Sequence, residues 1–158
     1  MSETSFLCYV VRHADAGKRG VVADDHRSLS RRGNAQAAAI ADALADAGIT
    51  QLLSSPYARC VETLEALAAR VGIAIEARDD LAEGAHATGA LAIVEHATAP
   101  LALCSHGDVI GDLMDVLHRR GVPLDDDRVA KGSTWTLTVG AGAVVAAHYV
   151  PAPRIDDA

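Results

Sequence analysis

The stretch LCYVVRHADAG, residues 7–17, joins an unbroken apolar run to an arginine and a histidine. A run that is apolar at every position predicts a strand buried on both faces, as in a parallel sheet covered by helices. Arg12 and His13 then stand at the carboxyl end of this strand, the edge where open α/β sheets bind ligands. Taken alone, the pair could equally be the first solvated residues of a loop. The rest of the chain must therefore distinguish a binding site from a loop.

Short apolar runs alternate with longer Ala-rich stretches along the chain, which predicts a layered α/β fold. Strands are expected at residues 6–11, 51–54, 73–77 and 101–105, and helices at residues 30–47, 58–71, 88–96 and 109–120. Two further strands, at 134–139 and 144–149, are separated by a Gly-Ala-Gly turn and predict a terminal hairpin. Ser30 is placed to cap the first helix, Gly48 to close it and Gly72 to close the second.

Length and composition set limits on the function. A chain of 158 residues with 50% hydrophobic content predicts one domain over 1–158, with residues 1–5 and 151–158 as loose termini. The net charge of -7 disfavours nucleic acid and anionic membranes as partners, so any anion site must be local. Three widely spaced cysteines indicate a reducing compartment, and no stretch is long enough to cross a bilayer, so we expect a cytoplasmic protein.

Two more polar clusters follow predicted strands, SSPYAR at residues 54–59 and SHGD at residues 105–108. If these strands are parallel to the first, both clusters share one sheet edge with Arg12 and His13. Two arginines and two histidines form a donor-rich set that suits the oxygens of a phosphoryl group. A neutral histidine can attack phosphorus while the other donates to the developing charge, which predicts a phosphohistidine intermediate.

Such a reaction also needs a carboxyl group, which first protonates the leaving atom and later activates water. Glu83, in the segment DDLAEGA, follows the third predicted strand at a similar depth and is our candidate for this acid and base.

Five segments together resemble the histidine phosphatase superfamily, also called phosphoglycerate-mutase-like. They are RHA at 12–14, LSxxGxxQA at 29–37, SSPYARCVET at 54–63, LAEG at 81–84 and SHG at 105–107. The resemblance implies that His13 is the nucleophile, that Arg12, Arg59 and His106 form the phosphate pocket, and that Glu83 donates the proton. It also implies a three-layer αβα sandwich around a mostly parallel central sheet, with neither a metal nor another cofactor.

Three departures refine this resemblance. Ala14 replaces the glycine that usually ends the first motif, but the reactive pair before it is intact. Arg27, in DDHRSLS, resembles a further pocket arginine of short phosphohistidine phosphatases of the SixA type. The segment AKGSTW resembles phosphatase domains that some bacteria fuse to Nudix hydrolases, which makes Lys131 a candidate for substrate binding, although a lone lysine before a strand is usually only solvated.

Only 23 positions separate Glu83 from His106, room for one helix and one strand but not for the long lid of many family members. Without a lid, water reaches a phosphohistidine, which favours a phosphatase over a mutase. An open site admits a phosphorylated protein, with phosphohistidine as one candidate, as well as a nucleotide or sugar phosphate. A module that binds phosphate without turning it over remains the alternative from another class.

Rival motifs are weaker. DDDRV at 125–129 matches the pattern of metal-dependent aspartyl phosphatases, but no buried strand precedes it, so we expect an acidic loop. KGS at 131–133 lacks the glycines of a phosphate-binding loop, and Cys104 lacks the arginine of cysteine phosphatases. We expect surface positions for the remaining histidines, His26, His86, His96, His118 and His148. His86 and Asp108 lie close enough in sequence to site residues to influence them.

Overall fold

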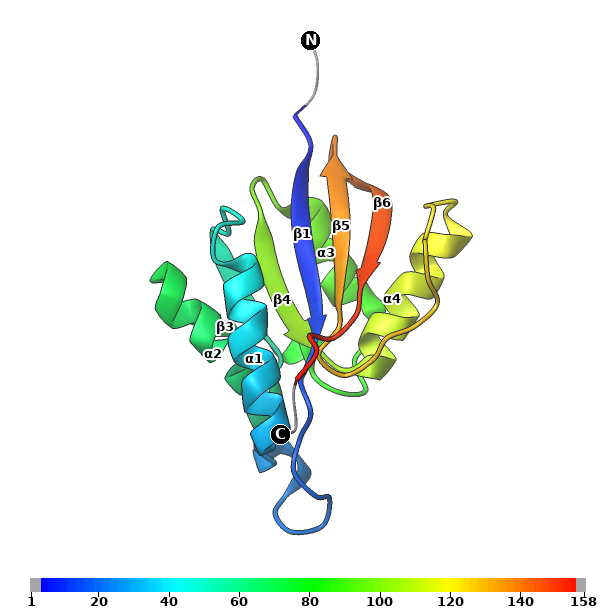
Figure 1. The fold of residues 1–158 in the computed structure, drawn as a ribbon. Coiled ribbons are helices and arrows are strands. Elements are labelled where there is room, and N and C mark those ends of the chain that lie inside the picture. The colour runs from blue at the N-terminus through cyan, green and yellow to red at the C-terminus, as the bar shows by residue number, and fades with distance from the viewer. Residues whose placement is uncertain (1–3, 156–158) are drawn as a thin grey trace.

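The structure is a computed structural model that describes residues 4–155, and its secondary structure alternates along the chain (Figure 1). The strands are β1 (Phe6–Arg12), β2 (Gln51–Ser54), β3 (Ile75–Ala77), β4 (Leu101–Ser105), β5 (Thr134–Gly140) and β6 (Ala143–Val150). The α-helices are α1 (Arg31–Leu44), α2 (Ala58–Val71), α3 (Ala87–His96) and α4 (Gly107–Arg119). Short 3-10 helices lie at Asp24–His26 and Asp79–Leu81.

All six strands form one sheet of order β3-β2-β4-β1-β5-β6. β1, β2, β3 and β4 are parallel, whereas β5 is antiparallel to β1 and forms a hairpin with β6. The predicted mostly parallel sheet and terminal hairpin are therefore confirmed. The register pairs Arg12 with Ser105 and Ser54 with Cys104, so the carboxyl ends of β1, β2 and β4 meet at one edge.

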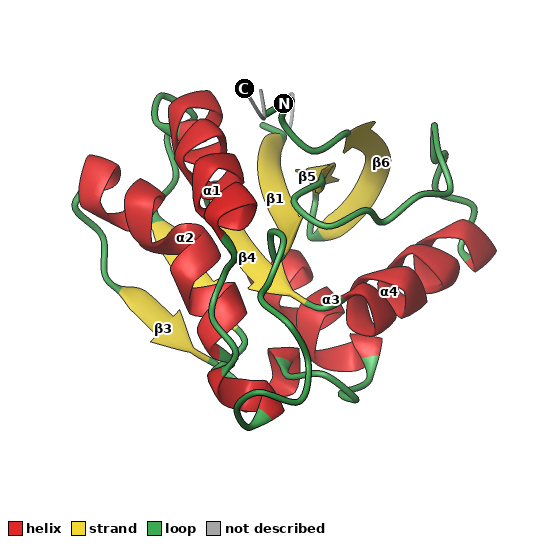
Figure 2. Cartoon of the chain, turned by 60° about the horizontal axis from the view of Figure 1, so that its bottom comes forward, coloured by secondary structure: helices red, strands yellow, loops and turns green. Residues whose placement is uncertain are grey.

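Helices cover both faces of the sheet, as the three-layer prediction requires (Figure 2). Alternate side chains of a strand point to opposite faces, which explains why β1 and β4 are apolar up to their last residues, Arg12 and Ser105. Val11 packs with residues of α1 and α2, whereas Val10, the next residue along, packs with residues of α3 and α4. Cys104 is fully buried in the α1/α2 layer, where it acts as a small apolar side chain.

Most predicted boundaries agree with the structure to within one residue, and three differ by more. Ser30 caps α1 as expected, because its hydroxyl accepts a hydrogen bond from the Gly33 amide at 3.0 Å. Gly48 does not close that helix, since α1 ends at Leu44 and a separate turn follows before the left-handed glycine at φ 74°. β3 begins at Ile75, two residues later than predicted. α4 begins at Gly107, two residues earlier than predicted, which places its first turn at the functional edge.

Residues 1–3 and 156–158 of the predicted loose termini lie outside the described residues. Residues 151–155 form no regular element, although Ala152 and Pro153 are half-buried. Between residues 4 and 155, no helix has the length and apolar character needed to cross a membrane.

Candidate active site

A cavity of about 240 Å³ opens where β1, β2 and β4 end. Its lining comprises Arg12, His13, Arg19, Arg27, Arg59, Glu83, Gly107, Asp108, Val129 and Lys131. Six of the seven predicted site residues are among them, and the seventh, His106, lies beside His13 with the ring centroids 5.4 Å apart. Sequence positions from 12 to 131 thus converge on one strongly cationic cavity in a chain whose net charge is negative.

His13 is the first residue after β1, and its amide donates to the Ser105 carbonyl of β4 at 3.1 Å. Its Nδ1 lies 2.9 Å from the Ala14 carbonyl oxygen, which can only accept, so we assign the ring proton to Nδ1. Burial lowers the pKa of His13 to about 3, and the neighbouring His106, Arg59 and Arg12 act in the same direction. The ring is therefore neutral near pH 7, with a free electron pair on Nε2.

Arg12, the last residue of β1, is held by the polypeptide on two sides. Its Nη1 donates to the Val129 carbonyl at 2.6 Å, and its guanidinium lies flat against Gly107 at the start of α4. A Cβ atom added to Gly107 would lie 2.8 Å from the Arg12 Cζ, closer than such atoms approach. The glycine is needed here because the helix and the guanidinium occupy adjacent space.

We therefore expect Gly107→Ala to displace the Arg12 guanidinium and to raise the KM for a phosphorylated substrate by roughly ten- to a hundredfold. Gly111→Ala is the matched control in the same helix, because a Cβ there would meet nothing within 4 Å. Steady-state kinetics of both variants check this expectation, and equal KM values for the two would contradict it.

Arg59, in the first turn of α2, is almost fully buried, with 1% of its surface exposed. Its Nη1 donates to the Asp24 carbonyl at 2.7 Å. Its Nη2 lies 3.2 Å from the Asp24 carboxylate, 3.5 Å from Glu83 Oε2 and 3.5 Å from His106 Nδ1. Arg59 therefore connects the candidate acid, Glu83, with the second histidine.

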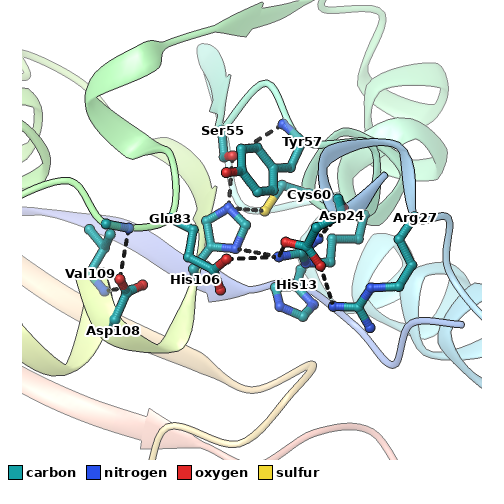
Figure 3. Close-up of polar contacts among 12 residues, drawn as sticks. His13, Asp24, Arg27, Ser55, Tyr57, Cys60, Glu83, His106, Asp108 and Val109 are labelled. Carbon is teal, nitrogen blue, oxygen red and sulfur yellow. Dashed lines mark hydrogen bonds and ion pairs between the residues drawn. The ribbon is translucent and has the colours of Figure 1, made fainter. Parts of the chain in front are cut away.

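Asp24 is a site residue that the sequence reasoning missed (Figure 3). Its carboxylate bridges Arg59 and Arg27, with Oδ1 3.4 Å from Arg27 Nη2. Although slight burial acts to raise it, the pKa of Asp24 is lowered overall by the guanidinium groups of Arg59 and Arg27. Arg27 is itself buried and donates to the Gly17 carbonyl at 2.9 Å, so the loop after β1 is folded back over the cavity. The spacing Asp-x-x-Arg at 24–27 is the signal that could have identified this bridge.

Three arginine Nε atoms, those of Arg12, Arg27 and Arg59, are buried without a hydrogen-bond partner among residues 4–155. A buried donor without an acceptor is costly, and proteins satisfy nearly all such groups. All three side chains line the same cavity, so an oxygen-rich anion bound there would supply the acceptors.

His106 is oriented by the turn between β2 and α2 and by Cys60 of α2. Its Nε2 lies 2.8 Å from Ser55 Oγ and 3.5 Å from Cys60 Sγ, while the Tyr57 ring packs edge-on against it (Figure 3). Arg59 Nη2, 3.5 Å from Nδ1, can only donate, so Nδ1 of a neutral His106 is the acceptor. The ring proton then lies on Nε2 and is donated to Ser55 Oγ, which also accepts from the Tyr57 amide. The sequence reasoning included SSPYAR but assigned Ser55 no part.

The remaining candidates have different surroundings. Lys131 lines the cavity with Arg19, which the sequence reasoning missed, and both are exposed. Asp108 accepts from the Gly84 amide at 2.8 Å and so ties the segment carrying Glu83 to α4. His86 precedes α3, is exposed and does not line the cavity. The other four predicted surface histidines, His26, His96, His118 and His148, are exposed as expected.

The DDDRV segment forms a loop between α4 and β5, as expected. Asp126 pairs with Arg128 at 2.7 Å, and Asp125 pairs with His148. These carboxylates do not line the cationic cavity, so they stand apart from the arginines that do.

Comparison with known proteins points in one direction. A model of the histidine phosphatase superfamily (branch 1) matches residues 8–89. The 8-oxo-(d)GTP phosphatase of Mycolicibacterium smegmatis is 35% identical over 154 residues, which cover 91% of this chain and 48% of that protein. The chain therefore spans about half the length of this curated relative.

Two solved structures share the fold. A protein of Agrobacterium tumefaciens assigned as the phosphohistidine phosphatase SixA is 26% identical, with a TM-score of 0.69 over 84% of this chain and 90% of that one. The protein histidine phosphatase SixA, solved with tungstate, is 19% identical, with a TM-score of 0.70 over 88% of this chain and 92% of that one. At 19% identity the second likeness shows the fold alone.

Proposed function

Because the chain belongs to the histidine phosphatase superfamily (branch 1), we propose that it is a phosphatase that transfers a phosphoryl group to His13 and then to water. One observation carries this proposal. A neutral imidazole with a free Nε2 adjoins a cavity around which three buried arginine Nε donors lack acceptors. A phosphoryl group offers both the electrophilic phosphorus and the missing acceptor oxygens.

The first step forms the phosphohistidine. Arg12, Arg27 and Arg59 hold the non-bridging oxygens, with His106 beside them, while His13 Nε2 attacks phosphorus. The bond from phosphorus to the leaving oxygen or nitrogen breaks, and the leaving atom takes the proton of Glu83. The positive charge that develops on the His13 ring is stabilised by the hydrogen bond from Nδ1 to the Ala14 carbonyl.

The second step regenerates the free enzyme. A water molecule loses a proton to the Glu83 carboxylate and attacks phosphorus, and the bond from phosphorus to Nε2 breaks. Inorganic phosphate leaves, His13 returns to its neutral form, and Glu83 is protonated again. The guanidinium groups supply the positive charge in both steps, so the proposal requires neither a metal nor another cofactor.

The substrate is a phosphorylated group that can enter an open site. Only α3 and β4 lie between Glu83 and His106, so no inserted lid separates these two residues. The name of the Mycolicibacterium relative supports a nucleotide, and that of the Agrobacterium structure supports phosphohistidine on a protein. The Mycolicibacterium relative is more identical to this chain, and its match covers more of this chain, than the Agrobacterium structure. This favours a nucleotide, with a phosphoprotein as the second candidate.

Covalent trapping tests the proposal. The protein is mixed with ³²P-labelled phosphoramidate and quenched within milliseconds, with and without a chelator. The expected result is label on His13 in an acid-labile, base-stable linkage, with phosphate release that the chelator does not change. A protein that binds phosphate but releases none from phosphoramidate, nucleotides or a phosphohistidine peptide would instead be a phosphate-binding module. A loss of activity with the chelator would revive the acidic DDDRV loop as a metal site.

The role of Glu83 depends on the leaving group. Glu83→Gln keeps the size of the side chain but removes the transferable proton, so release from an alkyl phosphate is expected to fall by about 10²–10⁴-fold. p-Nitrophenolate leaves without protonation, so the substitution should slow the first step less with p-nitrophenyl phosphate than with an alkyl phosphate. The kcat/KM values for both substrates check this, because they report the first step and not the hydrolysis of the shared phosphohistidine. Glu65→Gln, an exposed position on α2, is the control. An equal loss with both leaving groups would argue against proton donation by Glu83 in the first step.

A further inference from the structure

A second cavity, of about 380 Å³, lies between α4 and the segment that follows it. In Figure 1 this segment runs back beside α4 to the edge of the sheet where β1 and β4 end. Val129 lines both this cavity and the cationic one, and the Val129 carbonyl accepts the hydrogen bond from Arg12. The two cavities are therefore neighbours that share a wall at the phosphate site. We call the second one the α4 groove.

The α4 groove differs from the phosphate cavity in chemical character. Its apolar lining comes from Met114, Leu124, Val129 and Trp135. Its titratable lining comes from Asp115, Asp126, Asp127 and His118, and no arginine or lysine contributes to the lining. Asp126 is paired with Arg128, which lies outside the lining. Such a groove repels a second phosphate and suits an uncharged, flat group with N–H donors at its edges. Adjacent cationic and acidic-apolar compartments match one ligand with a phosphate at one end and an aromatic base at the other.

Gly111 gives independent support for a ligand in the α4 groove. It is the fifth residue of α4 and lines the groove, about 6 Å along the helix axis from the Gly107 that contacts Arg12. Glycine within a helix is destabilising relative to alanine, so a glycine there needs a reason. Packing is not that reason, because a Cβ at Gly111 would meet nothing within 4 Å. The missing side chain leaves open space in the groove wall nearest the phosphate site.

We propose that the α4 groove binds the base of a nucleotide whose phosphate occupies the cationic cavity. This inference rests on the proposed phosphatase function and specifies its substrate class. The base lies between the apolar wall and α4, its N–H edge faces the carboxylates, and the ribose crosses the region of Val129. A sugar phosphate fills only the cationic cavity and gains nothing from the groove.

The kinetic test compares guanosine monophosphate with ribose 5-phosphate, which lacks the base. The wild type is expected to favour the nucleotide by at least about tenfold in kcat/KM. Gly111→Leu fills the groove while improving helix propensity, so it should remove this preference and change ribose 5-phosphate turnover by less than about twofold. Gly111→Ala, which adds only a methyl group, should retain the preference. Equal losses for both substrates, or no loss with the nucleotide in a folded Gly111→Leu protein, would overturn the assignment.

A binding test separates the α4 groove from the phosphatase function. Trp135 is the sole tryptophan and lines the groove, so its fluorescence reports occupancy directly. Guanosine, which carries no phosphate and cannot be turned over, should quench this fluorescence in the wild type but not in Gly111→Leu. Quenching without any phosphatase activity would refute the proposed function alone. Phosphatase activity without quenching in the wild type would refute the groove assignment alone. If Gly111→Leu impairs a phosphohistidine peptide but not the nucleotide, the groove receives a peptide and the nucleotide assignment is wrong.

Discussion

Replacing His13 with alanine is expected to lower kcat for phosphate release by at least about 10⁴-fold and to abolish covalent labelling. The loss is large because His13 has a ring nitrogen free to attack and lies in the cavity that the arginines line. No other described histidine lines this cavity. Binding of inorganic phosphate should survive, since Arg12, Arg27 and Arg59 do not depend on the His13 ring for their recorded contacts.

Two measurements make this expectation specific to His13. The residual rate of His13→Ala is compared with that of His96→Ala, an exposed histidine at the end of α3, which should behave as wild type. Isothermal titration with phosphate then shows whether the cavity is intact. A protein that still turns over at wild-type rates, or that carries label at another residue, would remove His13 from the role of nucleophile.

Arg59→Ala is expected to lower kcat/KM by at least about a hundredfold, the scale of removing one preorganised charge donor. The effect reaches beyond the phosphate, because the Arg59 guanidinium contacts Asp24, Glu83 and His106. Without it, the Glu83 carboxylate, which lines the cavity, and the Asp24 carboxylate lose a positive partner, so the site repels the incoming anion more strongly. Arg59→Lys keeps the charge but not the planar fork, so it should recover only part of the loss.

Arg70→Ala is the matched control for this change. Arg70 lies on the same helix and pairs with Asp42, but half of its side chain is exposed, so both activity and stability should change little. Thermal melting distinguishes lost catalysis from lost folding, since Arg59 is also a large buried side chain. A loss of less than tenfold in a folded Arg59→Ala protein would place this arginine outside the phosphate-binding set.

Local sequence signals were sufficient for most of the fold and for the residues that end strands. The apolar run before Arg12 predicts a strand because burial on both faces requires apolar residues. Ser30 predicts a helix start because the first turn needs a capping side chain. The carboxyl ends of parallel strands share one edge, so His13, Arg59 and His106 could be grouped before their distances were known.

The missed residues depend on contacts between distant parts of the chain. Asp24 begins a short 3-10 helix, and its position between Arg27 and Arg59 follows from how the segment after β1 folds back. Ser55 reaches His106 only because β2 and β4 pair in the register Ser54 to Cys104. The early start of α4 has a similar origin, since Gly107 gains its importance from the Arg12 guanidinium against it.

The central place of β1 has a consequence for how this protein is made. β1 pairs with β4 and β5, so Arg12 lies opposite Ser105 and Phe6 lies opposite Val139. A ribosome that has already released His13 into solvent must add more than a hundred residues before both neighbouring strands exist. Contacts between such distant parts of a chain slow folding, so the His13 imidazole is synthesised well before the strands that immobilise it.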